Sequence, residues 1–140
     1  MKLSNYVNEE VLYFKNGIFG FETYKNFLAL PIEEGNIDIL SLQSVDDDQI
    51  SFLIMNPFKL DGGYDPKLTQ EDFESVDATK EEELAYYVIC VMNEQVDKIT
   101  VNMKCPVVVN AIKKTGAQII LNSDEYKIRQ SLSEYKNKGE

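Results

Sequence analysis

The segment from Ile99 to Asn110 constrains the fold more than any other, because two β-prone runs meet in it at a single proline. In the first run, Ile99, Val101 and Met103 alternate with polar residues, the period-two pattern of a strand that buries one face. Pro106 removes a backbone donor and fixes φ, which disfavours one continuous central strand. The three valines that follow predict a strand covered on both faces. The segment therefore predicts a β core with a corner, and it contains no catalytic residue.

Short β-prone runs separated by turn residues continue through most of the chain. The runs expected as strands are Val11–Phe14, Phe27–Ile32, Ile37–Val45, Ile50–Met55, Tyr86–Met92 and Ala117–Leu121. A short helix is expected at Gln70–Val76, where Thr69 and Asp72 have the spacing of a capping box. Glu81–Glu83 has the composition of a helical first turn, but the run after it is β-prone, so its structure stays open. Without any βαβ alternation, the pattern predicts a mainly β fold, an antiparallel barrel or sandwich with short helical insertions.

The size of the chain predicts a single domain over residues 1–140. Its C-terminal part is ambiguous between strand and helix. Tyr126, Ile128 and Leu132 have the alternation of a strand, whereas Ile128, Leu132 and Tyr135 have the spacing of one helical face. Both alternatives stay open, and the tail from about residue 133 to 140 is expected to fray.

The charge balance favours some classes of partner over others. Fourteen Lys and Arg against twenty-four Asp and Glu leave a net charge of −10. Such a surface repels phosphate backbones, so nucleic acid is not expected as a direct partner. Basic proteins are better partners, because complementary fields accelerate their encounter. The acidity could equally serve only to keep the protein soluble.

Histidine is absent, which excludes Ser-His-Asp and Cys-His catalysis and His-bearing zinc sites. We therefore expect no enzymatic activity, cofactor or metal. Cys90 lies in an apolar run and is expected to be buried, whereas Cys105 precedes Pro106; a disulfide between them stays open. Met1–Asn5 lacks an apolar signal region, and no apolar run is long enough to span a bilayer. A reduced, cytoplasmic protein without membrane contact is the expectation.

Two acidic segments are candidate partner-binding sites. Asp46–Asp48 forms a polar hairpin loop between two predicted strands, and it lacks the ligand spacing of a calcium loop. Glu81–Glu83 belongs to a second acidic stretch that begins at Glu71. Each segment is either a solvated surface or a charged surface that faces a basic partner.

Gly17 and Gly20 bracket Ile18 and Phe19, which indicates a tight turn or bulge with unusual φ. The segment is not a GxGxxG motif and lacks the Lys-Ser/Thr of a phosphate loop. A rigid β-turn that displays an aromatic ring is the better interpretation. We expect one of Phe19 and Phe21 in the core and the other as an exposed interface anchor.

Five motifs can be compared with known families: Phe14–Glu22, Leu42–Ser44, Phe52–Pro57, Ile99–Asn110 and Gly116–Leu121. Together they resemble the FliW family of bacterial flagellar assembly factors. They occur in the family's order and cover most of residues 11–129. The family usually has a small residue where this chain has Cys105.

The resemblance implies a small β-barrel-like domain that binds proteins and catalyses no reaction. FliW-like proteins bind CsrA, a dimeric RNA-binding translational repressor, and they also bind flagellin. Flagellin that has not been exported takes up FliW and frees CsrA to silence flagellin mRNA. The resemblance thus implies an antagonist of CsrA that couples flagellin export to its translation. The alternative is a flagellin-specific chaperone without a role in translation.

We expect the acidic segments to face CsrA, which must be basic where it meets RNA, with an exposed aromatic side chain nearby. The predicted partner-binding residues are Asp46, Asp47, Asp48, Phe19, Phe21, Tyr64, Glu81, Glu82 and Glu83.

Overall fold

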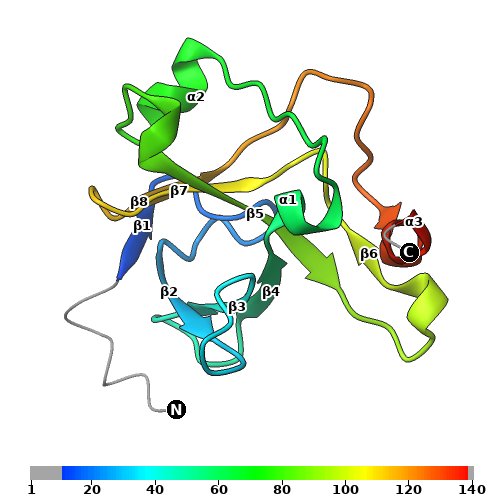
Figure 1. Ribbon diagram of the computed structural model, residues 1–140. Coiled ribbons are helices and arrows are strands. Elements are labelled where there is room, and N and C mark those ends of the chain that lie inside the picture. The colour runs from blue at the N-terminus through cyan, green and yellow to red at the C-terminus, as the bar shows by residue number, and fades with distance from the viewer. Residues whose placement is uncertain (1–10, 139–140) are drawn as a thin grey trace.

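The computed structural model describes residues 11–138, with side chains through residue 135 (Figure 1). Met1–Asn5, the segment considered for a signal region, lies outside the described residues, as do residues 139 and 140. The strands are β1 (Leu12–Phe14), β2 (Asn26–Pro31), β3 (Ile39–Ser44), β4 (Ser51–Met55), β5 (Leu84–Val91), β6 (Thr100–Val101), β7 (Val107–Asn110), β8 (Thr115–Gln118) and β9 (Gln130–Ser131). The helices are α1 (Pro57–Leu60), α2 (Gln70–Ser75) and α3 (Leu132–Lys138), with 3-10 turns η2 (Glu81–Glu83) and η3 (Val96–Lys98). Within residues 11–138, each helix is too short or too polar to span a bilayer.

The sheet closes into a barrel. Seven strands follow one another in the order β4-β3-β2-β1-β8-β7-β5, and a pairing of β5 with β4 completes the ring. β6 and β9 extend the sheet beyond the end of β5. All these pairs are antiparallel except β1 with β8, where Tyr13 lies opposite Thr115 in a parallel register. The mainly β, barrel-like prediction is confirmed, with one parallel seam that the antiparallel expectation lacked.

Hydrophobic side chains form two clusters, one inside the barrel and one outside its wall. The interior cluster consists of Leu12, Phe14, Ile18, Phe27, Leu40, Leu42, Ile54, Val107 and Val109. The outer cluster lies under α2 and the connections that follow α1, and it includes Tyr64, Val88, Val101, Val108 and Tyr126. β7 separates the two clusters, since its valines alternate between them. This confirms the prediction of a strand covered on both faces.

The corner predicted at Pro106 is present. Ile99, Val101 and Met103 are buried, but paired strand structure is limited to the two residues of β6. The chain then bends, and the side-chain oxygen of Asn102 accepts a hydrogen bond from Cys105 N at 2.9 Å. Cys90 and Cys105 are both buried and free, so no disulfide joins them.

Local signals identified some elements and missed others. The capping box between Thr69 and Asp72 is present at the start of α2. The Glu83 carboxylate caps the start of the second acidic turn by accepting hydrogen bonds from the backbone N–H groups of Thr79 and Lys80. The turn does not extend beyond a 3-10 turn, because strand β5 begins directly after it. Helix α1 was not predicted; Asn56 caps it by accepting a hydrogen bond from Phe58 N.

Both alternatives for the C-terminal part occur in succession. Residues 130–131 form β9 beside β6, and Leu132 begins α3. Leu132 and Tyr135 then pack against the outer cluster. Residues 133–138, expected to fray, have helical backbone.

Two buried tyrosines of the outer cluster differ in how their hydroxyl groups are satisfied. Tyr64 Oη donates to the carbonyl of Met103 at 2.7 Å. Tyr86 Oη is buried, and no described residue offers it a hydrogen-bond partner. Burial, with a smaller contribution from the charge of Glu81, raises the pKa of Tyr86 to about 12. Burial also raises the pKa of Tyr64.

This difference predicts opposite outcomes for two matched substitutions. Tyr64→Phe leaves a buried carbonyl without its donor, and we expect it to lower the free energy of unfolding by about 1–3 kcal/mol. Tyr86→Phe removes an unpartnered hydroxyl and should be neutral or stabilising. Urea denaturation at neutral pH measures both. An equal loss of stability in the two variants would contradict the assignment of their hydrogen bonds.

Candidate functional site

A hollow of about 700 Å³, here called the mouth groove, opens between the Gly17–Tyr24 segment and the ends of β5 and β6. It arises because β5 continues beyond the barrel. Tyr87 and Ile89 pack against the interior cluster, and Val91, two residues further on the same face, is 61% exposed. The apolar side chains that line the groove include Phe19, Phe21, Phe52, Ile89, Val91 and Ile128.

The turn that carries the two phenylalanines is fixed by its own hydrogen bonds. Gly17 and Gly20 have φ values of 68° and 87°, which favour glycine. Phe21 N donates to the Ile18 carbonyl at 2.7 Å, and Gly20 N donates to the Glu22 carboxylate at 2.9 Å. Hydrogen bonds from the backbone N–H groups of Gly20 and of Glu22 itself lower the pKa of the Glu22 carboxyl. The predicted tight turn is confirmed.

The expectation that one ring of the turn is buried was wrong. Phe19 and Phe21 are 44% and 38% exposed, while Ile18 is the residue that enters the barrel interior. The two closely spaced glycines reverse the chain so that only Ile18 points inward. Phe21 packs edge-on against Phe52 at a centroid distance of 5.1 Å, which limits its freedom without burying it.

Gln118 connects the turn to the corner of the chain. Its Oε1 accepts a hydrogen bond from Phe19 N at 3.0 Å, and its Nε2 donates to the Cys105 carbonyl at 3.2 Å. Sequence reasoning assigned no role to this residue. Its place in a strand gave no signal of these bonds, which join it to residues 99 and 13 positions away. The groove is therefore formed before any partner binds.

The predicted acidic loop lies next to this turn. Ser44 Oγ accepts hydrogen bonds from the backbone N–H groups of Asp46 and Asp47, each at 3.1 Å. Tyr24 Oη donates to an Asp47 carboxylate oxygen at 3.3 Å, and Tyr24 N donates to the Phe21 carbonyl. The negative charge of Asp47 raises the pKa of Tyr24. Asp46 and Asp48 are exposed to solvent, which leaves their charges available to a partner.

The other predicted site residues lie elsewhere. Tyr64 is only 4% exposed and packs against Phe58 and Tyr126, so the expectation of an exposed aromatic anchor there was wrong. Glu81–Glu83 precede β5 at the end opposite the mouth groove. Roughly 25 Å of extended strand separates Glu83 from Val91 at about 3.3 Å per residue. The structure thus brings together Asp46–Asp48 with the phenylalanines of the turn, and separates them from Glu81–Glu83.

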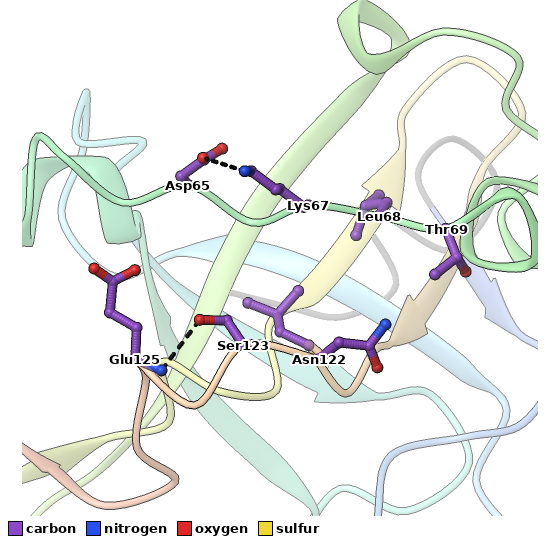
Figure 2. A pocket seen from close by; sticks show the side chains of 8 residues that line it. Asp65, Lys67, Leu68, Thr69, Asn122, Ser123 and Glu125 are labelled. Atoms are coloured by element: carbon purple, nitrogen blue, oxygen red, sulfur yellow. Dashed lines mark hydrogen bonds and ion pairs between the residues drawn. The ribbon is translucent and has the colours of Figure 1, made fainter.

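A second hollow, of about 470 Å³, lies between two irregular connections (Figure 2). One wall comes from Asp65 to Thr69 and the other from Leu121 to Glu125. Asp65 and Lys67 form an exposed ion pair at 3.7 Å, which contributes little to stability. None of the predicted site residues lines this hollow. In residues 11–138, no group of three His, Cys, Asp or Glu side chains is placed to bind a metal ion.

Comparison with known proteins places this chain in a family. The family model described as "FliW protein" matches residues 2–132. Three proteins named flagellar assembly factor FliW are similar along nearly their whole length. The protein from Caldanaerobacter subterraneus subsp. tengcongensis is 37% identical over 136 residues, 95% of this chain and 89% of its own. The Clostridium tetani protein is 34% identical over 134 residues, with coverage of 96% and 92%.

The Clostridium botulinum strain Hall protein is 32% identical over 127 residues, 91% of this chain and 88% of its own. A crystal structure of the flagellar assembly factor FliW matches the fold with a TM-score of 0.81 and 31% identity. That match covers 89% of this chain and 86% of the other. On these matches, and with the barrel and its turn as described, this chain belongs to the FliW family of flagellar assembly factors.

Proposed function

We propose that this protein antagonises the translational repressor CsrA in the cytoplasm and also binds flagellin, so that flagellin export is coupled to flagellin translation. It acts by occupying other proteins and catalyses no reaction. The observation that supports this most is a preformed apolar groove, rimmed by exposed phenylalanines, beside an ordered acidic loop. A rigid groove of this kind suits protein binding, because little conformational freedom is lost on association.

Charge supports CsrA as one partner. CsrA is basic where it meets RNA, and this chain has a net charge of −10. Complementary fields accelerate association, and the same negative field repels RNA. The exposed Asp46 and Asp48 place this charge beside the turn that displays Phe19 and Phe21 as aromatic anchors.

Switching between two partners requires only that binding of one changes the affinity for the other. A coupling free energy of roughly 1–3 kcal/mol changes affinity by a factor of about 5 to 150. The alternative function, a flagellin chaperone without a role in translation, predicts flagellin binding with no measurable affinity for CsrA.

The acidic loop provides the test of CsrA binding. We expect Asp46→Lys/Asp48→Lys to weaken the affinity for CsrA several-fold and to reduce its salt dependence, because rim charges act mainly on association. Asp47 is left in place because it accepts the Tyr24 hydrogen bond. Isothermal titration calorimetry of CsrA at two salt concentrations measures both quantities.

The matched control is Glu81→Lys/Glu82→Lys, which makes the same change in charge at exposed positions far from the mouth groove. It should retain more of the affinity than the loop variant. If both variants lost the same affinity for CsrA, the change in net charge alone would explain the loss. Unchanged binding in both would remove the acidic segments from the CsrA contact.

A further inference from the structure

The charged side chains that line the mouth groove have the sign opposite to the protein as a whole. They are Lys98, at the end of η3, and Arg129, next to β9. Both are exposed, and neither forms an ion pair with any residue of the described part of the chain. In a chain with ten more acidic than basic residues, an apolar groove with two cations and no carboxylate is a local inversion of charge.

Two polar side chains on the groove wall, those of Gln118 and Asn102, already form hydrogen bonds within the protein. Gln118 is bonded to Phe19 N and the Cys105 carbonyl, and Asn102 accepts from Cys105 N. An occupant therefore meets mainly apolar side chains in the groove and unpaired positive charge at its edge. Val91 and Ile128 are 61% and 58% exposed, so their burial by an occupant would be favourable.

We propose that the mouth groove binds a segment of a partner protein in which apolar side chains stand beside one or more carboxylates. The apolar side chains contact Phe19, Phe21 and Val91, and a carboxylate pairs with Arg129, whose planar guanidinium can bind it through two hydrogen bonds. A volume of about 700 Å³ lies within the usual range of binding pockets and accommodates several side chains of such a segment.

Of the two partners, flagellin is the occupant that this chemistry favours, a choice that rests on the proposed function. CsrA, as a basic RNA-binding protein, would be repelled by Lys98 and Arg129, and it is better matched to the acidic loop. The mouth of the barrel thus carries two neighbouring surfaces of opposite sign. They are linked through the Tyr24 contacts to Asp47 and Phe21.

The test uses the full chain and calorimetric titration with monomeric flagellin and, separately, with CsrA. We expect Lys98→Glu/Arg129→Glu to weaken flagellin binding at least tenfold and to leave CsrA binding within about twofold. Phe19→Ser should weaken flagellin binding at least fivefold, because it removes an aromatic anchor without changing charge. The matched control Lys67→Glu/Lys113→Glu makes the same charge change at exposed positions outside the groove and should bind flagellin as the wild type does.

The outcomes separate the inference from the proposed function. If the wild type binds neither protein, the proposed function fails, and flagellin as the occupant fails with it. If the wild type binds flagellin and both groove variants bind it equally well, only the groove assignment is overturned. If the charge variant loses CsrA and retains flagellin, the occupant is wrong. Equal weakening by the groove and control charge variants, with Phe19→Ser unaffected, would also overturn the assignment.

Discussion

Replacement of Phe14 by alanine is expected to lower the free energy of unfolding by about 3–5 kcal/mol, as measured by urea denaturation. The Phe14 ring is fully buried and packs edge-on against Phe27 at a centroid distance of 5.3 Å. Its removal leaves a cavity in the barrel interior, which the surrounding strands cannot close without breaking their pairing. The loss is a large share of the roughly 5–15 kcal/mol that stabilises a typical domain.

The reciprocal substitution tests the same contact from the other side. A Cβ added at Gly116, the parallel-strand partner of Phe14, would lie 2.7 and 2.8 Å from two ring carbons and closer still to a third, Cζ. Gly116→Ala alone should therefore destabilise the fold by about 1–3 kcal/mol through overpacking.

In the Phe14→Ala background the added methyl group enters the cavity, so Gly116→Ala should be nearly neutral there. The control Gly62→Ala, where no heavy atom lies within 4 Å, should change stability by less than about 0.5 kcal/mol. If the losses in free energy of unfolding from Phe14→Ala and Gly116→Ala were strictly additive in the double variant, this would contradict a direct contact between the two positions.

The second large effect is expected at Gly17, because this position is constrained both in conformation and in space. Its φ is +68°, and a Cβ there would lie 2.7 Å from the Cα of Glu22, a backbone atom that cannot move aside. Gly17→Ala should lower stability by about 1–3 kcal/mol. Relief of the overlap also displaces Phe19 and Phe21, so flagellin binding measured by calorimetry should fall at least tenfold.

Gly20→Ala is the matched control for this prediction. Gly20 has a similar φ of +87°, but no heavy atom lies within 4 Å of the added methyl group. The Gly20→Ala variant therefore has the same kind of backbone strain as Gly17→Ala, but it has no steric overlap. Binding should therefore be retained to a greater extent in Gly20→Ala. If the two variants lost flagellin binding equally, backbone strain alone would account for the loss, without any contribution from the steric overlap.

The sequence predicted the strands and local turns well because their signals are local. The alternation around Val101, the proline at position 106 and the valines of β7 each specify a conformation without reference to distant residues. The acidic loop between β3 and β4 followed from the short connection, which joins strands that do pair antiparallel. The α1 helix was missed because a single turn has too few residues to show a helical period.

The candidate site could be predicted only in pieces. The glycine turn and Asp46–Asp48 were recognised separately, but their proximity depends on Tyr24. The groove also needs Phe52, Val91 and Ile128, which come from segments whose relative placement follows from barrel closure. The burial of Tyr64 likewise depends on the distant Met103 carbonyl. Such long-range pairings leave no periodic trace in the sequence.

The parallel seam between β1 and β8 has a consequence for how the protein forms during synthesis. Tyr13 can meet Thr115 only after most of the chain has left the ribosome, although β2, β3 and β4 can already form a meander with β1. Until then the nascent chain presents an open edge and an uncovered interior face, the kind of surface on which unfinished β proteins associate with one another. Premature termination after β4 and before residue 116 should consequently yield an insoluble product, although its first four strands are complete.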